Sequence, residues 1–399
     1  MPTNNPPAAR ASSTMSHISR VLDILKHRAV LPAAILGLLA GCAVSPPSPP
    51  TPGPPPVAAP GAAPAGDVVV RARSRWVAAD WKDLPEWGAD RTAELWPALL
   101  RGCERPAPGW EATCAAARQQ PPAHDAAARE WLQQRLRPYR VESPEGAVDG
   151  LITGYFEPLV EASRQPRGAM RVALHQPPTD LPTRKPYWTR QQLDTLPAAQ
   201  ASLKGRELAY VADPLDLLIL QIQGSGRLAV TEADGSRRLV RAAFAGHNDQ
   251  PYKSVGRWLI EQKELRADQA SWPGIKAWAQ ANRARLNEML WANPRVVFFR
   301  EEPLPDPAAG PRGAQGVPLT PGRSIAVDPQ SVPYGTPVWL DTTEPLVSTP
   351  LRRLVMAQDT GSAITGAVRA DYFWGWGDMA EQQAGRMKQP LRMWVLWPR

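Results

Sequence analysis

The 399-residue sequence lacks a long hydrophobic run and has few residues of the types that bind metal ions. A transmembrane helix needs about 20 consecutive apolar residues, and the longest apolar segment, residues 29–40, is much shorter. A polytopic membrane protein is therefore excluded. The histidines are scattered and do not have the spacing of metal ligands: His17, His27, His124, His175 and His247. We expect no metal and no other cofactor.

Cysteine is also scarce, with three residues in the chain. The first ends the apolar segment in Leu39-Ala40-Gly41-Cys42, which follows a basic flank and resembles a bacterial lipobox. We expect residues 1–41 to be a lipoprotein signal peptide, with Met15 as an alternative start, and Cys42 to carry the lipid. An ordinary signal peptide that happens to end in this sequence is the alternative. The residue after Cys42 is Ala43 and not an aspartate, which resembles the outer-membrane sorting pattern of bacterial lipoproteins. This indicates a lipid anchor on the periplasmic face of the outer membrane.

Residues 42–66 consist mainly of Pro, Ala, Ser and Gly and carry no charge. A segment of this composition cannot bury a core, so we expect an extended tether. The remaining cysteines, Cys103 and Cys114, are an even pair. In an oxidising periplasm they can form a disulfide, and the alternative is two reduced, buried cysteines.

The charge balance argues against one class of partner. The formal net charge is +8, and removal of residues 1–41 would leave +5. This mild excess fits an acidic polymer as a partner. It is too diffuse for the concentrated basic stripe of a nucleic-acid-binding protein, so we expect no nucleic acid.

Residues 67–170 and 171–293 differ in character. In the first section we expect helices around 93–101 and 125–135 and a strand at 151–158. In the second, the apolar run 217–223 predicts a buried strand, and residues 228–231 and 239–244 flank a turn and predict a hairpin. Ser254 is expected to cap a short helix, and Ser271 a longer one that continues to residue 293.

Residues 294–399 contain short strand signals separated by Pro and Gly, which favour a small barrel or sandwich. One helix is expected near 378–387. The predicted strands are 296–299, 323–327, 337–340, 354–358 and 393–397.

The densest functional signal is residues 357–377, AQDTGSAITGAVRADYFWGWG, which contain Asp359 and Asp371. Backbone N–H groups of the turn after Asp359 can bind its carboxylate, whereas aromatic residues follow Asp371. Hydrogen bonds lower a carboxyl pKa and apolar burial raises it, so we expect the two pKa values to diverge. A protonated acid beside aromatic rings is typical of sites that cleave glycosidic bonds. The alternative is that these aspartates only cap or form turns.

This segment resembles the C-terminal three-aspartate barrel domain of the membrane-bound lytic murein transglycosylase A family. The resemblance covers nearly all of the chain from Trp76 onward, in the family's order. The other matching blocks are GYFEP at 154–158, LQIQGSGR at 220–227, AGHNDQPYKSVG at 245–256, NPRVVFF at 293–299 and GRSIAVDPQSVPYG at 322–335.

The resemblance implies a mainly β fold with helices. A double-psi β-barrel is built from both ends of the chain, from residues 67–170 and 294–399, and a second β-rich domain, residues 171–293, is inserted between them. It also implies a peptidoglycan lytic exotransglycosylase. Such an enzyme cleaves the β-1,4 bond between N-acetylmuramic acid and N-acetylglucosamine without water and leaves a 1,6-anhydro end. The residues themselves leave open whether cleavage starts at chain ends or internally.

By position in the motif, Asp371 matches the family's catalytic acid and base. Asp359 and Asp328 match the other two aspartates; we expect Asp359 to position groups or stabilise charge, and Asp328 to be structural. The residues expected to contact the substrate are Gln223, Gly224, Ser225, Tyr155, Tyr372 and Trp374, with Glu157 as a weaker candidate. The expected partners are peptidoglycan glycan strands, the outer membrane through the lipid anchor, and other cell-wall enzymes.

Two other functions compete with this hypothesis. A non-catalytic outer-membrane lipoprotein could bind peptidoglycan with the same barrel. A serine hydrolase is suggested by Gly224-Ser225-Gly226, with His247 as the base, but the G-x-S-x-G elbow of such enzymes is missing. Activity of an Asp371→Asn variant separates the first alternative from the enzyme, and activity of Ser225→Ala tests the second.

Overall fold

The computed structural model describes residues 68–399. The predicted signal peptide, the lipidation site Cys42 and the tether at 42–66 lie outside these residues. Within residues 68–399, none of the helices combines the length and the apolar character needed to cross a membrane.

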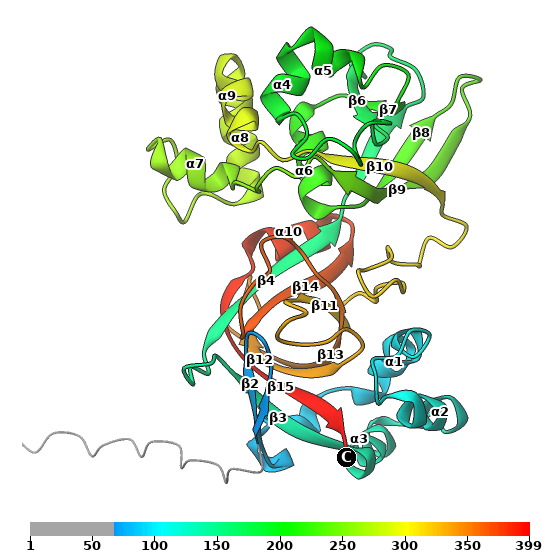
Figure 1. Cartoon of the computed structure of the whole chain (residues 1–399), viewed down its shortest axis with the longest axis vertical. Helices are drawn as coiled ribbons and strands as arrows, with labels where there is room; N and C mark the ends of the chain where they lie inside the picture. Colours follow the sequence, from blue (N-terminus) through cyan, green and yellow to red (C-terminus); the bar gives the residue numbers. More distant parts are fainter. Residues whose placement is uncertain (1–67) are drawn as a thin grey trace, which may run out of the picture. The chain divides into compact units, whose positions relative to one another are not determined.

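Six strands form a nearly closed β-barrel (Figure 1). Their order is β15, β12, β13, β11, β14, β4, and an additional pairing of β15 with β4 joins the two edges. Apolar side chains such as Ile152, Val355 and Val395 fill the interior. The strands are β4 (Gly150–Glu157), β11 (Ser324–Val327), β12 (Pro337–Thr343), β13 (Pro350–Asp359), β14 (Arg369–Trp376) and β15 (Lys388–Pro398).

The pairing pattern identifies the barrel type. Two parallel pairs, β4 with β14 and β11 with β13, lie among antiparallel ones. This is the arrangement of a double-psi β-barrel, the fold class predicted from the sequence. The barrel also needs both ends of the chain, because Ile152 of β4 lies opposite Ala370 of β14 and Gln389 of β15. The expectation that the barrel is built from both ends of the chain is confirmed.

Three strands and three helices extend the barrel domain. Strands β1 (Val68–Val70), β2 (Arg75–Ala78) and β3 (Leu136–Glu142) continue the sheet beyond β15. Helices α1 (Trp96–Gly102), α2 (Glu111–Gln119) and α3 (Asp125–Arg135) lie together beside it, and α1 and α3 confirm the two predicted helices (Figure 1). Tryptophans that are far apart in sequence meet here. The rings of Trp96 and Trp131 are 4.9 Å apart, and that of Trp87 is 5.1 Å from Trp339 of β12.

The inserted domain is built on a six-stranded sheet with the order β10, β9, β8, β5, β7, β6. The predicted hairpin is confirmed as β8 and β9, and the expected domain range 171–293 leaves out β5 and β10. The strands are β5 (Leu159–Ser163), β6 (Val172–His175), β7 (Glu207–Val211), β8 (Gly226–Thr231), β9 (Arg237–His247) and β10 (Val297–Pro303). The helices are α4 (Arg190–Thr195), α5 (Pro197–Ala201), α6 (Pro214–Gln223), α7 (Val255–Glu261), α8 (Trp272–Ala281) and α9 (Leu286–Ala292).

The strand predicted at 217–223 is wrong, because these residues form the last seven of the ten residues of helix α6. The Asp213 carboxylate accepts the N–H of Leu215 at 2.8 Å, Pro214 occupies the first turn, and Gly224 ends the helix with φ 82°. These are start and stop signals of a helix. A continuous apolar run does not distinguish a buried helix from a buried strand, so the flanking residues carried the decisive signal.

The long helix predicted from Ser271 to residue 293 is also wrong in part, since α8 and α9 are separate helices. Asn282 adopts φ −122° and ψ 49°, which ends α8. The four apolar residues expected on one face, Ile275, Trp278, Leu286 and Leu290, are nevertheless buried in one cluster. Ser254 caps α7 as predicted, accepting the N–H of Arg257, and α10 (Asp378–Arg386) confirms the last expected helix.

The two connections between the barrel and the inserted domain meet at Glu157. Its carboxylate is fully buried and accepts bonds from Arg227 at 2.8 Å and Arg241 at 2.6 Å. The same guanidinium groups donate to the carbonyls of Pro307 and Ala309, on the segment that returns to the barrel. Glu157 therefore joins the outgoing and returning chains and is structural, which corrects its candidacy as a sugar contact.

Candidate active site

The two aspartates of the predicted catalytic segment flank one barrel strand. Asp371, on β14, lies opposite Thr153 of β4 on one side and Ala326 of β11 on the other. Asp359, the last residue of β13, pairs with the same Ala326 at a register shift. Neighbouring strands lie about 4.8 Å apart, so the backbones of the two aspartates are roughly 10 Å from each other. The barrel brings these residues together.

The carboxyl group of Asp371 is held through one of its two oxygens. The Thr153 hydroxyl donates to Oδ1 at 2.6 Å, and the Arg369 guanidinium donates to the Thr153 hydroxyl at 2.9 Å. Among residues 68–399, no donor forms a hydrogen bond with Oδ2 of Asp371. The side chain also keeps some contact with solvent. Oδ2 is therefore the oxygen that can carry a proton toward a ligand.

The environment of Asp371 raises its pKa from 3.8 to about 6. Loss of hydration is the largest cause, and the charge of Asp359 acts in the same direction. The Thr153 hydrogen bond and the Arg369 charge oppose the increase without cancelling it. Asp371 is thus protonated at mildly acidic pH and can release the proton near neutrality, as an acid and base of one reaction must.

Asp359 has both carboxylate oxygens bound. The Tyr155 hydroxyl donates to Oδ2 at 2.9 Å, and the backbone N–H of Ala314 donates to Oδ1 at 2.9 Å. The N–H of Thr360 adds a third bond. Desolvation still raises the pKa of Asp359 above its ordinary value. The expectation that hydrogen bonds would lower this pKa is wrong, because burial outweighs them.

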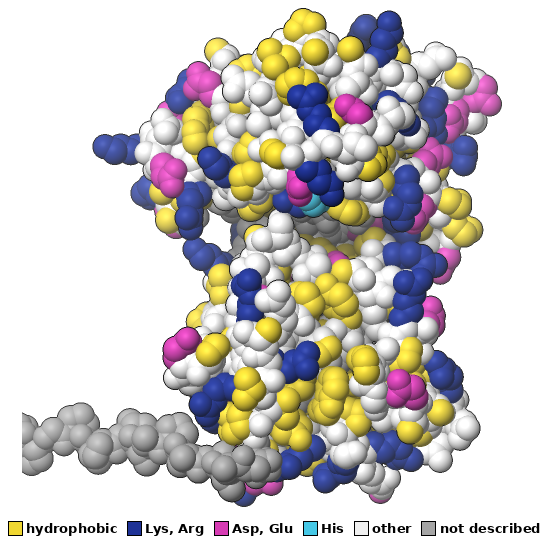
Figure 2. Space-filling model, viewed as in Figure 1, with side chains coloured by type: hydrophobic (Ala, Val, Ile, Leu, Met, Phe, Trp, Pro, Cys, Tyr) yellow, Lys and Arg dark blue, Asp and Glu magenta, His cyan; other side chains and the backbone are white. Residues whose placement is uncertain are grey.

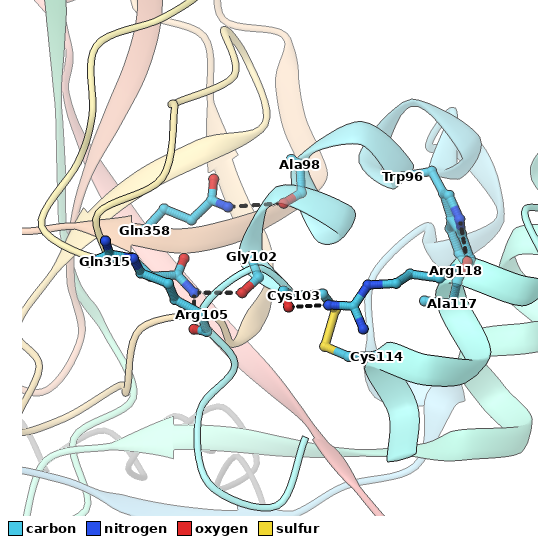
Figure 3. Close-up of a disulfide and its surroundings, with 10 residues drawn as sticks. All are labelled: Trp96, Ala98, Gly102, Cys103, Arg105, Cys114, Ala117, Arg118, Gln315 and Gln358. Carbon is cyan, nitrogen blue, oxygen red and sulfur yellow. Dashed lines mark hydrogen bonds between the residues drawn. A yellow bond between two sulfur atoms is a disulfide. The ribbon is translucent and has the colours of Figure 1, made fainter. Parts of the chain in front are cut away.

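A disulfide-linked helical hairpin supports the loop that binds Asp359. Figure 3 shows the disulfide and the hydrogen bonds from Gln315 of that loop to the hairpin. Cys103, at the end of α1, is bonded to Cys114 of α2. The buried side-chain amide of Gln315 donates to the carbonyls of Gly102 at 3.0 Å and Arg105 at 2.9 Å, on either side of Cys103. Gln315 directly follows Ala314, the residue whose N–H holds Asp359. The hairpin therefore fixes the backbone that orients this carboxylate.

Tyr252, from the inserted domain, is electrostatically coupled to Asp371 of the barrel. The negative charge of Asp371 raises the pKa of Tyr252, after the larger effect of burial. The tyrosine is in the segment between β9 and α7 and is partly exposed. The inserted domain thus contributes a candidate residue to the site, about 120 positions before Asp371 in sequence.

Several residues of the site were not identified from the sequence: Thr153, Arg369, Ala314 and Tyr252. Tyr252 does fall within the matching block at 245–256, and Thr153 directly precedes the block at 154–158. Arg369 is two positions before Asp371, and in a strand such residues share one face. The spacing of Arg369 from Asp371 could therefore have indicated its role. Ala314 acts through its backbone N–H, which no sequence pattern reveals.

The aromatic residues predicted to contact sugar have different environments. Tyr372 is fully buried in the barrel core, and its hydroxyl donates to the Gly322 carbonyl at 2.8 Å. It is a core residue and not a sugar platform. Tyr155 is partly exposed with its hydroxyl bound to Asp359, and Trp374 is partly exposed with its indole N–H on the sulfur of Met387. Sugar contact by Tyr155 and Trp374 stays a prediction.

The residues predicted to line the opposite side of the groove lie where α6 ends. The Gln223 side-chain oxygen accepts the N–H of Phe156 of β4 at 3.1 Å, so Gln223 ties the inserted domain to the barrel. Gly224 and Ser225 form the turn into β8 and are partly exposed. Within residues 68–399, no hydrogen bond joins the Ser225 hydroxyl to a histidine. Substrate contact by Gln223, Gly224 and Ser225 stays a prediction.

The third aspartate of the motif, Asp328, is buried and binds backbone. It accepts the N–H of Gln330 at 3.0 Å and of Gly366 at 2.9 Å.

In the part of the chain that the structure covers, no group of three or more His, Cys, Asp or Glu could hold a metal. On the face shown in Figure 2, basic and acidic side chains are mixed over the surface.

Comparisons with known proteins agree with this architecture. Residues 151–300 match the family model of the MltA specific insert domain, and residues 323–397 match that of the 3D domain. The membrane-bound lytic murein transglycosylase A of Vibrio cholerae is 32% identical over 259 residues, which are 62% of this chain and 65% of that protein. The chain thus spans just under two thirds of this relative.

Two solved structures cover the fold more fully. The lytic transglycosylase LtgG of Burkholderia pseudomallei is 45% identical, with a TM-score of 0.58, over 85% of this chain and 100% of that chain. MltA from Neisseria gonorrhoeae is 32% identical, with a TM-score of 0.70, over 84% of this chain and 95% of that chain.

The barrel, the inserted domain and these relatives define an enzyme of the lytic transglycosylase class. Within that class, the protein belongs to the membrane-bound lytic murein transglycosylase A family, as its sequence motifs indicated.

Proposed function

We propose that this protein cleaves the glycan strands of peptidoglycan at the β-1,4 bond between N-acetylmuramic acid and N-acetylglucosamine, without water. The observation that carries the proposal is Asp371, a carboxyl group with a pKa of about 6 and one oxygen without a donor in residues 68–399. Family membership supports the same reaction class.

The reaction needs one proton carrier. Protonated Asp371 donates from Oδ2 to the glycosidic oxygen while the bond from muramic C1 to that oxygen breaks. Ionised Asp371 then takes the proton of the C6 hydroxyl, whose oxygen attacks C1. The products are a 1,6-anhydromuramic end and a free 4-hydroxyl on N-acetylglucosamine, and Asp371 is again protonated.

A hydrolytic mechanism is less compatible with the site. A retaining hydrolase needs a second carboxylate free to act as nucleophile. Both oxygens of Asp359 are already bound, by Tyr155 and Ala314. An internal hydroxyl has a high effective concentration at C1 and needs no further activation. Asp359 is therefore assigned to stabilising positive charge on the sugar and to fixing Tyr155.

We place the enzyme at the periplasmic face of the outer membrane, anchored by lipid on Cys42, where peptidoglycan is within reach of the tether. The Vibrio cholerae relative is named as a membrane-bound enzyme, which supports a membrane location. Other cell-wall enzymes are proposed protein partners at this location.

The test is digestion of purified murein sacculi by the wild-type protein and by Asp371→Asn. Removal of a general acid and base is expected to lower the rate by about 10²- to 10⁴-fold while binding to sacculi is retained. Asp268→Asn, an exposed aspartate of the inserted domain, is the matched control and should keep full activity. Binding without any release of muropeptides by the wild-type protein would support the non-catalytic alternative.

A further inference from the structure

A cavity of about 730 Å³ lies on the inserted domain, and its lining includes Tyr252. Its size is within the range of about 300–1,000 Å³ that is usual for small-ligand sites. Three aromatic side chains and two cations line it: Tyr252, Trp258, Trp291, Lys253 and Arg257. An aromatic wall with cations at its edge suits an amphipathic anion.

The aromatic walls are fixed before any ligand arrives. The Trp291 indole N–H donates to the Asp194 carboxylate at 2.8 Å. The Trp258 ring packs edge-on against Trp278, with 6.2 Å between their centroids. A wall already held by other contacts loses little freedom on binding, which favours affinity.

The two cations are available to a ligand. Both side chains are exposed, and within residues 68–399 neither the Lys253 ammonium nor the Arg257 guanidinium contacts a carboxylate. Two other cations of the domain are paired: Lys276 with Glu381 at 2.8 Å, and Arg285 with Glu264. Glu261, the acid in the lining, balances one of the two free charges and leaves the cavity cationic.

Tyr252 connects this cavity to the reacting bond. It is part of the cavity lining, and the charge of Asp371 raises its pKa. Trp258, also in the lining, packs against the same hydrophobic cluster as Trp374 of the catalytic segment. A group bound in the cavity is thus adjacent to the sugar on which Asp371 acts. That sugar is N-acetylmuramic acid, and its lactyl group carries the peptide stem of peptidoglycan.

We infer that the cavity binds the acidic peptide stem of the muramic acid residue at which cleavage occurs. Lys253 and Arg257 bind carboxylates of the stem, and Trp258 and Trp291 contact its aliphatic groups. In stem-bearing strands the lactyl carboxyl of each muramic acid forms the amide bond to the stem, so the carboxylates of the substrate lie on the stem, which is the part that matches two cations. This inference rests on the proposed function, because it takes peptidoglycan as the substrate.

The test compares two matched substrates with the full-length protein. One is murein glycan strands that carry peptide stems, and the other is the same strands after an amidase has removed the stems, which leaves only the single lactyl carboxylate of each muramic acid. In Lys253→Ala/Arg257→Ala, the ratio of kcat/KM for stem-bearing over stem-free strands is expected to fall about tenfold relative to the wild-type ratio. Lys204→Ala/Arg167→Ala, which removes two exposed cations of the same domain, should leave the ratio as in the wild-type protein.

A ratio unchanged in the cavity variant would overturn the inference, whether both rates fall together or neither falls. Binding of a free stem tetrapeptide, measured by tryptophan fluorescence, gives a second readout that does not depend on cleavage. Saturable binding that weakens about tenfold in the cavity variant supports the inference, and no binding by the wild-type protein overturns it. A wild-type protein that cleaves neither substrate would instead contradict the proposed function.

Discussion

Replacing Asp371 by asparagine should make the protein more stable, and more so at neutral than at acidic pH. The folded protein holds the proton of Asp371 with a pKa of about 6, compared with an ordinary value of 3.8. Between these two pH values the folded state binds more protons than the unfolded chain. The free energy of unfolding of the wild-type protein therefore falls as the pH rises through this window. Asparagine has no charge to desolvate, and its side-chain oxygen can still accept the Thr153 hydrogen bond.

The size of the effect follows from the pKa difference. About two pKa units at about 1.36 kcal/mol each give a cost of about 3 kcal/mol for the ionised carboxylate at pH values above about 7. At about pH 4.5 the folded carboxyl is protonated, and the cost is about 1 kcal/mol because only the unfolded chain ionises. The stabilisation by Asp371→Asn should thus be about 2 kcal/mol larger at about pH 7.5 than at about pH 4.5.

Urea denaturation followed by tryptophan fluorescence at these two pH values measures the effect. Asp268→Asn is the control, since its ion pair with Arg266 is exposed to solvent and such pairs contribute little to stability. Equal effects of Asp371→Asn at both pH values, or a smaller one at neutral pH, would refute a raised pKa at this position.

Three further substitutions test how the site is supported. Thr153→Val removes the hydroxyl bonded to Asp371, so kcat should fall about tenfold. Because that bond lowers the pKa of Asp371, its loss should raise this pKa, and the decline of activity with rising pH should move to higher pH in a pH–rate profile. Cys103→Ser/Cys114→Ser should lower the free energy of unfolding by about 2–3 kcal/mol in urea denaturation, because it opens a loop with a sequence separation of 11, and should lower kcat by loosening the Ala314 loop. Glu157→Gln leaves two buried arginines without a carboxylate and should cost about 3–5 kcal/mol, seen as a lower Tm.

Each of these tests has a control or a contrary outcome. Thr153→Ser keeps the hydroxyl and should restore most of the activity and the original pH profile. A normal kcat in the double serine variant would limit the disulfide to a stabilising role. Glu161→Gln breaks an exposed ion pair with Arg237 and should lower the free energy of unfolding by less than about 1 kcal/mol. An equally small loss of stability in Glu157→Gln would show that the buried ion pairs of Glu157 do not stabilise the fold.

Much of the barrel could be predicted from the sequence. Pro and Gly separate its short strands, and the blocks at 154–158 and 357–377 have residue patterns specific enough to indicate a shared fold. The pairing of β4 with β14 followed from that fold and places Asp371 beside Thr153. The disulfide between Cys103 and Cys114 followed from an even cysteine count and from the expected export of the chain.

Other features depend on contacts that the sequence does not reveal. All of residues 217–223 are apolar except two glutamines, so the sequence pattern of this segment fits a buried helix and a buried strand equally well. The direction of the pKa shift of Asp359 depends on how strongly desolvation competes with three hydrogen bonds, which requires the packed structure. Tyr372 looked like a sugar contact because it follows Asp371, but consecutive residues of a strand point to opposite faces.

The mass of the released products tests the role of Asp371 most directly. Purified sacculi are digested with the wild-type protein and with Asp371→Asn, and the muropeptides are analysed by mass spectrometry. Ring closure by the muramic C6 hydroxyl predicts products lighter by one water molecule than their hydrolysed counterparts, and predicts their loss in the variant. Products with ordinary reducing ends from the wild-type protein, or unchanged anhydro products from Asp371→Asn, would contradict catalysis by this carboxyl group.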